Sequence, residues 1–222
     1  PLASNLELRN GRFEGRTVAP SFVGGLVAQA TVADQRVVYY PTSGVTPGGL
    51  PGLIERLREL ERSLGVTESL VPARATFIQM PGLAQGETVV LPDTILLTGI
   101  DQSLAADILV AATPMRLERE NLKEAFARVL NDPGSLDDLQ SARPTDGEIA
   151  RLEKARLSAH SDMETVQSYC YPAKNAVFWL FREKLREEGL EDALRDTYTY
   201  ISSDSTMSEL GFLSRRDTTE AQ

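Results

Sequence analysis

The distribution of glycine and proline constrains the fold of this chain more than any single motif does. Of the 16 glycines, 12 lie before Thr113, together with 8 of the 12 prolines, whereas 9 of the 14 aromatic residues follow it. Glycine and proline at this density mark turns between short strands, and the second half carries long segments with helical apolar spacing. The sequence predicts an α+β fold, in which an antiparallel or mixed β-rich half with one helix has a helical half packed on it.

The same change in composition suggests a domain organisation. Residues 1–113 are predicted to form a β-rich region with Gly/Pro loops and residues 114–213 a helical region, while residues 214–222 form a flexible polar tail. A chain of 222 residues is long enough for one large domain or two small ones. We expect the two regions to form one continuous globular unit.

A hairpin signal opens the chain, because Asn10-Gly11 suits the positive φ angles of a type I′ turn over residues 6–15. The resulting register pairs Glu7 with Glu14, Leu8 with Phe13 and Arg9 with Arg12. Like charges facing each other are unfavourable unless diagonal Glu and Arg partners compensate.

Other β-rich runs follow between turn residues. The predicted strands cover residues 26–32, 36–40, 74–80, 87–91 and 95–100. The first two flank a turn at Asp34-Gln35, and the paired valines and tyrosines of the second suggest burial on both faces. Residues 107–112 are ambiguous between strand and helix.

Helix starts and ends are marked by capping residues. One amphipathic helix is predicted over residues 53–64, closed by Gly65, and another starts at Thr113-Pro114. Capping boxes at Ser135/Asp138, Thr145/Glu148 and Ser161/Glu164 predict helices near residues 136–141, 146–160 and 162–171.

The densest apolar cluster runs from Tyr171 to Gly189 and contains the only tryptophan. Its apolar spacing predicts a helix at the centre of the second half. We expect Phe181 in the core and Phe178 or Trp179 to be shared with a neighbouring subunit. Residues 197–201 fit either a late strand or a helix end, and residues 205–213 are a possible last helix.

The net charge of −9 argues against general binding to a phosphate backbone. The basic cluster Arg9, Arg12 and Arg16 is interleaved with acids, which is typical of a solvated hairpin face. No run of about 18 apolar residues predicts a membrane span. The residues after Pro1 lack the features of a classical signal peptide, so we expect a location in the cytoplasm or within an assembled particle.

A glycine-rich loop at residues 44–52 lies between a predicted strand and a predicted helix, where backbone N–H groups can bind an anion. The candidate ligand-binding residues are Gly44, Thr46, Gly48 and Gly49, with Arg56 as the nearest cation. The loop lacks the lysine of a P-loop, and Pro47 and Pro51 remove two donors. A plain surface or assembly loop is the favoured interpretation.

Catalytic and metal chemistry have little support in the sequence. His160 is the only histidine, and no G-x-S-x-G nucleophile motif occurs, so we predict no catalytic residue. Cys170 is the only cysteine, which excludes an internal disulfide and a Cys-based zinc site. We expect Cys170 to be buried in its helix, and we expect neither a metal nor a cofactor, with magnesium bound through a substrate phosphate left open.

Three functions are consistent with these features. The favoured hypothesis is a non-enzymatic structural subunit that forms a homo-oligomer such as a shell, a virion capsid or a filament. The first alternative is a small-ligand protein or an enzyme that uses the loop at residues 44–52 as an anion cradle. The second is an adaptor that presents an aromatic helix face to a protein partner. The candidate interface residues are Phe178, Trp179, Tyr198 and Tyr200.

Overall fold

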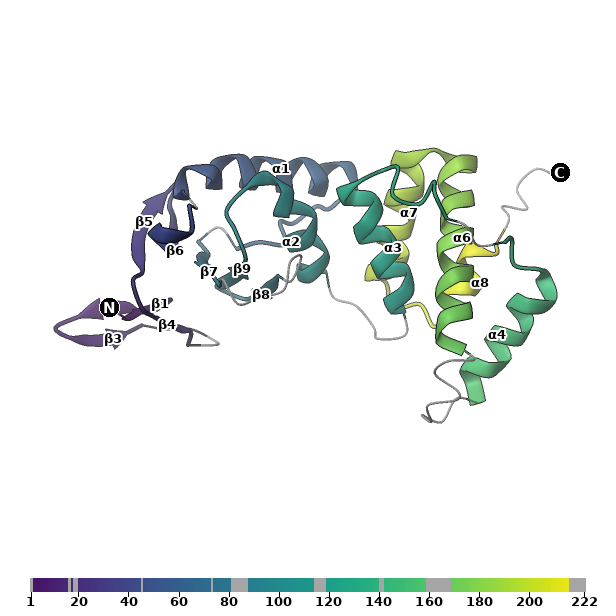
Figure 1. Ribbon diagram of the computed structural model, residues 1–222, viewed down its shortest axis with the longest axis horizontal. Coiled ribbons are helices and arrows are strands. Elements are labelled where there is room, and N and C mark those ends of the chain that lie inside the picture. The colour runs from purple at the N-terminus through teal and green to yellow at the C-terminus, as the bar shows by residue number, and fades with distance from the viewer. Residues whose placement is uncertain are drawn as a thin grey trace. The chain divides into compact units, whose positions relative to one another are not determined.

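The computed structural model describes residues 2–15, 17, 20–44, 46–72, 74–80, 88–113, 119–139, 142–158 and 169–215. The chain divides into two compact units, Pro1–Thr113 and Pro114–Gln222 (Figure 1). The first is rich in strands and the second is helical, which confirms the α+β class. The expectation of one continuous globular unit stays a prediction.

A five-stranded mixed sheet forms the centre of the first unit, with the strand order β5-β6-β7-β9-β8. The strands are β5 (Ala28–Val32), β6 (Gln35–Tyr39), β7 (Thr76–Gln79), β8 (Val89–Leu91) and β9 (Thr94–Leu97). β6, β7 and β9 run parallel, whereas β5 and β8 pair antiparallel at the two edges. The parallel step from β6 to β7 requires a crossover, which α1 (Leu50–Ser63) provides.

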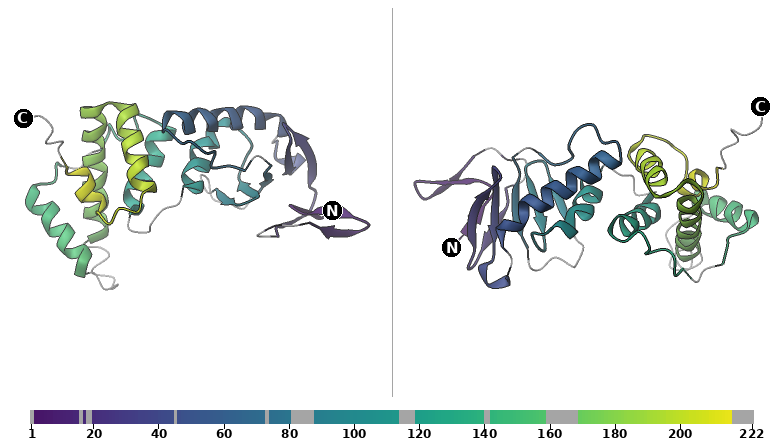
Figure 2. Two further views of the ribbon diagram at one scale, coloured as in Figure 1. Left: turned by 180° about the vertical axis from the view of Figure 1, so that it is seen from behind. Right: turned by 90° about the horizontal axis from the view of Figure 1, so that it is seen from above.

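Both faces of this sheet are covered. Val37 and Val38 are neighbours on β6 whose side chains point to opposite faces, and both are fully buried, as the sequence predicted. Val38 packs with Ala3 and Val23 of a two-stranded ribbon made by β1 (Leu2–Ser4) and β4 (Phe22–Gly24). The helices α1 and α2 (Ala105–Ala112) lie on the other face (Figure 2).

The predicted loop at residues 44–52 and the predicted start of the first helix at residue 53 both need correction. Residues 41–52 contain the short 3-10 helices η1 (Pro41–Ser43) and η2 (Pro47–Gly49), and α1 begins at Leu50. Proline is tolerated in a first helical turn because its missing N–H would have no partner there, so Pro51 continues the helix instead of preventing it.

The ambiguous residues 107–112 belong to α2, which follows η3 (Gln102–Leu104), so the described part of the first unit has two α-helices. The turn between β5 and β6 is Ala33-Asp34, one residue earlier than predicted. Both residues have positive φ angles, of 48° and 62°, as a type I′ turn requires.

Five helices make up the described part of the second unit. They are α3 (Glu120–Asn131), α4 (Asp146–Ser158), α6 (Tyr171–Glu188), α7 (Leu190–Ser202) and α8 (Glu209–Leu213). α6 has the predicted ends, with a proline in its first turn and Gly189 at a φ of 86° after its last residue. It packs against the other four helices, and Phe181 is fully buried, as predicted.

Two buried charged side chains close helix ends in this unit. Arg119 donates hydrogen bonds to the carbonyl oxygens of Ile201 (2.9 Å) and Ser203 (3.0 Å) at the end of α7. Glu209 accepts hydrogen bonds from the backbone N–H of Leu122 (2.9 Å) and from the side chain of Asn121 (2.6 Å) at the start of α3. Backbone groups that a helix leaves unpaired are thus satisfied by residues distant in the sequence.

The predicted capping residues have different outcomes. Thr145 and Glu148 form the capping box of α4, with Thr145 N donating to Glu148 (2.8 Å) and Glu148 N to Thr145 Oγ1 (3.2 Å). The box at Ser135 does not start a helix, because residues 133–138 form successive turns. The box at residues 161–164 lies outside the described residues. Thr113 ends α2, where its hydroxyl donates to Leu109 O (2.7 Å), and α3 begins only at Glu120.

Residues 197–201 belong to α7 and do not form a strand. The alternation of threonine and tyrosine there also fits a helix, because Ala193, Thr197 and Ile201 are buried at a spacing of four residues. Cys170 is exposed, not buried. The last predicted helix is shorter than expected, since α8 begins after Ser208, whose hydroxyl accepts from Gly211 N (2.8 Å).

Candidate assembly interface

The hairpin of β2 (Glu7–Arg9) and β3 (Arg12–Glu14), here termed the arm, projects from the first unit (Figure 1). Its antiparallel register is the predicted one. Asn10 and Gly11 form its turn with φ angles of 47° and 79°. The arm is therefore encoded locally, by an Asn-Gly turn between two short runs with alternating side chains.

One face of the arm is apolar and exposed to solvent. Leu8 lies opposite Phe13, and the ring of Phe13 meets the ring of Phe22 edge-on, with 5.5 Å between centroids. Leu8 is 60% exposed and Phe22 52%. Leu8 and Phe13 of the arm and Phe22 of β4 are together termed the arm patch. They leave apolar surface in water that a single two-stranded hairpin cannot bury by itself.

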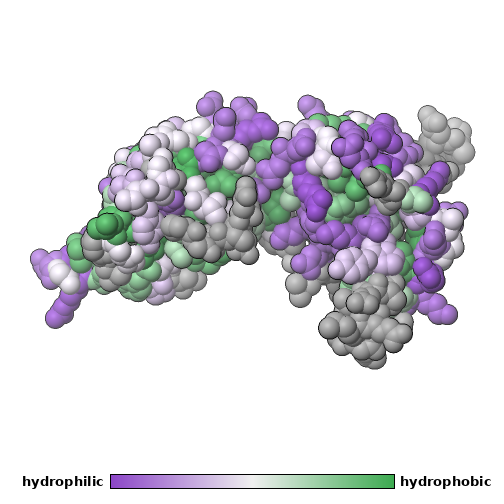
Figure 3. Space-filling model, in the orientation of Figure 1, coloured by the Kyte–Doolittle hydropathy of each residue, from purple (hydrophilic) through white to green (hydrophobic). Residues whose placement is uncertain are grey.

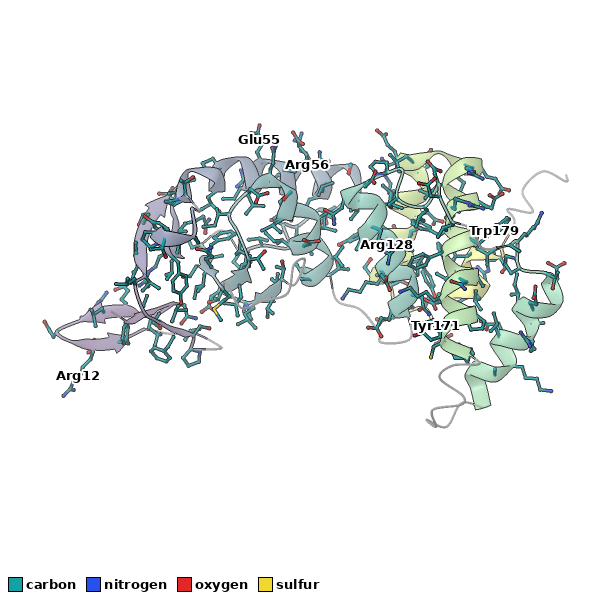
Figure 4. The ribbon with its side chains drawn as sticks, viewed as in Figure 1. Arg12, Glu55, Arg56, Arg128, Tyr171 and Trp179 are labelled. Atoms are coloured by element: carbon teal, nitrogen blue, oxygen red, sulfur yellow. The ribbon has the colours of Figure 1, made fainter. Side chains whose placement is uncertain are left out.

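The base of the arm is fixed to the sheet. Asn5 donates hydrogen bonds to the hydroxyls of Thr17 (3.0 Å) and Thr94 (2.8 Å), and Arg36 donates to the carbonyl oxygen of Leu6 (2.8 Å). Partial burial lowers the pKa of Arg36, and the nearby Glu7 carboxylate opposes that shift. These bonds hold the base while the tip, marked by Arg12 in Figure 4, stays exposed.

The opposite face of the arm carries equal numbers of both charges, from Glu7, Arg9, Arg12 and Glu14. The predicted compensation of like charges comes from within a strand, since Arg9 Nε donates to Glu7 (2.9 Å). The first 40 residues contain four arginines and three acidic residues, so the negative excess of the chain lies entirely in the remainder. The arm therefore lies in the part of the sequence with the least negative charge.

Polar and apolar residues are also separated on the surface of the first unit. In Figure 3 the tip of the arm is hydrophilic, and hydrophobic residues gather nearer its base. Leu26, between β4 and β5, is the most exposed of the large apolar side chains in the described residues, at 72%. Of the six exposed large apolar side chains in the described residues, three lie in the first 40 residues, where the charge is nearly balanced: Leu8, Phe22 and Leu26.

The predicted anion cradle has another structural role. The N–H of Gly49 donates to the carbonyl oxygen of Thr46 (3.3 Å), and the N–H of Leu50 donates to that of Pro47. A Cβ on Gly49 would lie 2.2 Å from the carbonyl oxygen of Ile100, so close packing of the chain requires glycine there.

The remaining residues of the predicted ligand site do not converge on the backbone N–H groups of Gly49 and Leu50. Gly44 has a φ of 74° at the end of η1, and Gly48 lies within η2. Arg56 lies on the outer side of α1 (Figure 4), and its guanidinium pairs with Glu59 (3.0 Å). A ligand-binding role for Gly44, Thr46, Gly48, Gly49 and Arg56 stays a prediction.

An open hollow of about 790 Å³, which the sequence did not indicate, lies beside α1. It is lined by the β5–β6 turn, by α1 and by the loop after α1, including Asp34, Arg58 and Arg62. Its buried carboxylate, Glu61, accepts hydrogen bonds from Ser69 Oγ (2.9 Å) and Leu70 N (2.7 Å). Glu61 therefore holds the loop that follows α1.

The four aromatic residues predicted at an interface are buried in the second unit. They are Phe178, Trp179, Tyr198 and Tyr200. Arg128 lies 5.1 Å from the Phe178 ring centroid, and Arg143 and Arg182 lie 5.4 and 5.5 Å from that of Trp179. The ring of Tyr200 stacks on Phe212 at 4.0 Å.

These contacts use the aromatic faces inside their own unit, in which Figure 4 labels Trp179 and Arg128. An interface role for the four residues stays a prediction, and they offer little free surface in this conformation.

No group of three or more His, Cys, Asp or Glu side chains in the described part of the chain could hold a metal ion. His160 lies outside the described residues. No described helix combines the length and the apolar character needed to cross a membrane. Comparisons of the chain with family models, with curated proteins and with solved structures found no match.

Proposed function

We propose that this chain is a non-enzymatic structural subunit that associates with copies of itself, and that the arm makes the contact. The observation that carries the proposal is the exposed arm patch, in which Leu8 and Phe13 of the anchored hairpin and Phe22 of β4 present apolar surface. Burying such surface is the main favourable term in protein association.

A second copy is the partner that the charges favour. A chain with a net charge of −9 repels its own copies over most of its surface, but the arm is neutral and carries both signs on one face. Two arms can therefore pack their apolar faces together while Glu and Arg side chains of different copies approach at the rim. The proposed assembly is of the shell, virion or filament type, located in the cytoplasm or within a particle.

Multi-angle light scattering over a concentration series tests this proposal. The wild-type chain should exceed the monomer mass of 24.3 kDa, and its mass should rise with concentration. The double variant Leu8→Ser/Phe22→Ser should form smaller species, because it removes two side chains of the arm patch. Far-UV circular dichroism confirms that the variant is folded.

The matched control is Tyr171→Ser, which removes a side chain of similar exposure, 68%, from the second unit. This control should keep the wild-type mass. A wild-type chain that stays at 24.3 kDa at every concentration would overturn the proposal. A double variant that assembles as the wild type does would show that the arm is not the contact.

A further inference from the structure

The edge strand β5 lacks the charge, the proline and the bulge that commonly protect sheet edges. It consists of Ala28, Gln29, Ala30, Thr31 and Val32, so it contains neither a charge nor a proline. Among the described residues it pairs only with β6, and its outer side ends the sheet. Natural proteins usually place lysine, proline or a bulge on such an edge, because unpaired N–H and C=O groups there attract another strand.

The register of β5 fixes which backbone groups point outward. The two-residue turn Ala33-Asp34 makes Val32 and Gln35 a hydrogen-bonded pair. Because hydrogen-bonded and non-hydrogen-bonded pairs alternate, Ala30 and Ala28 also bond to β6. The N–H and C=O groups of Gln29 and Thr31 therefore point to the open edge.

We propose that β5 pairs antiparallel with β5 of a second copy, about a twofold axis at Ala30, and so joins two sheets into one. This inference rests on the proposed self-association but uses a surface separate from the arm patch. In this register Gln29 of each copy lies opposite Thr31 of the other. All the outward backbone groups of the two residues are then paired.

The side chains of β5 fit this register. Ala30 meets its own counterpart in a non-hydrogen-bonded pair, where Cα atoms approach to about 4.5 Å and small side chains fit best. Ala28 lies opposite Val32, and no two charges face each other. Arg36 is the charged residue on the neighbouring strand, and it is engaged with Gln29 Oε1 (3.1 Å) and Leu6 O.

The two contacts have different consequences for assembly. A twofold β5 contact joins only two copies, because each copy contributes the same strand to it. The arm supplies a second, independent contact, and two contacts per subunit allow dimers to join into larger assemblies. Loss of the arm should therefore leave dimers, and loss of both contacts should leave monomers.

Cross-linking tests the register without disturbing the sheet. In a Cys170→Ser background, which removes the exposed native thiol, Ala30→Cys should form a disulfide-linked dimer upon mild oxidation. The matched control is Gln29→Cys, whose counterpart lies diagonally at about 7 to 8 Å, too far for ready bridging. A monomeric Ala30→Cys chain, or equal cross-linking at both positions, would overturn the inference.

A proline substitution tests the contact in solution. Thr31→Pro removes an outward N–H that the β5–β6 ladder does not use, and Thr31→Val retains it. In the Leu8→Ser/Phe22→Ser background, light scattering should give about 24.3 kDa for Thr31→Pro and about twice that mass for Thr31→Val.

These outcomes separate the two proposals. Equal masses for the proline and valine variants would overturn the β5 contact. If proline lowers the mass but Leu8→Ser/Phe22→Ser leaves it unchanged, the arm fails as a contact and the β5 contact stands.

Discussion

The arm and α6 use apolar side chains in opposite ways. α6 carries a wide aromatic stripe, and four helices of its own unit cover it, so Phe181 is fully buried. The arm patch is small, yet its residues Leu8 and Phe22 are more than half exposed. A dense apolar cluster therefore forms the core of the second unit, whereas the few apolar residues of the arm patch stay exposed to solvent.

The largest expected effect tests the core side of this comparison. Phe181→Ala should lower the free energy of unfolding by about 3 to 5 kcal/mol, because it leaves a cavity among α6 and its neighbours. Urea denaturation measures the change, with the exposed Tyr171→Ala on the same helix as the control. If Phe181→Ala left the free energy of unfolding almost unchanged, this face of α6 would not be part of the core.

An intermediate effect is expected at α4. Thr145→Ala should destabilise α4 by about 1 kcal/mol, because it removes the hydroxyl that caps Glu148 N. Native-state hydrogen exchange of the α4 amides measures this local stability. Ser135→Ala is the control, since the Ser135 hydroxyl is buried without a hydrogen-bond partner and its loss should cost almost nothing. If Thr145→Ala and Ser135→Ala lowered the stability of α4 equally, the capping box at Thr145 would not stabilise this helix.

A smaller, pH-dependent effect is expected where Glu124 of α3 meets α6. Burial raises the pKa of Glu124, but hydrogen bonds and charges from Lys174 (2.8 Å) and Arg128 (2.7 Å) outweigh this and lower the pKa below its ordinary value. A lowered pKa stabilises the fold above the unfolded-state value of about 4.3, and this contribution is lost as the pH falls through the folded-state pKa.

The stability difference between wild type and Glu124→Gln should therefore be constant near neutral pH and shrink in acid. Denaturation curves at several pH values measure it. A difference that grows as the pH falls would contradict the assigned direction of the pKa shift.

The smallest effect on folding is expected in the arm itself. Leu8→Ser should change the free energy of unfolding by less than about 0.5 kcal/mol, because Leu8 is mostly exposed in the folded chain. Denaturation at a concentration where the chain is monomeric isolates folding from association. A loss of several kcal/mol would mean that Leu8 is part of the core, and the contrast with Phe181 would disappear.

Local signals predicted a large part of this fold. The Asn10-Gly11 turn fixed the register of the arm, and the ends of α6 follow from a proline and a glycine. The order of the sheet could not be read in this way, because β6, β7 and β9 pair across long stretches of sequence. Residues 197–201 were ambiguous because their pattern matches both a strand and a helix.

The candidate interface was only partly visible in the sequence. The hairpin and its residues were identifiable, but exposure of Leu8 depends on which elements cover the arm, and that is a property of the tertiary fold. The same holds for Arg119 and Glu209, whose partners lie more than 80 residues away. The edge position of β5 likewise depends on the order of the whole sheet.

Hydrogen exchange over a dilution series tests the central claim, self-association through the first unit, most directly. The outward amides of Gln29 and Thr31 and the amides of the arm should exchange slowly in concentrated protein and faster upon dilution, while those of the α6 core should not change. Arm and β5 amides that exchange at the same rate at every concentration would contradict the account.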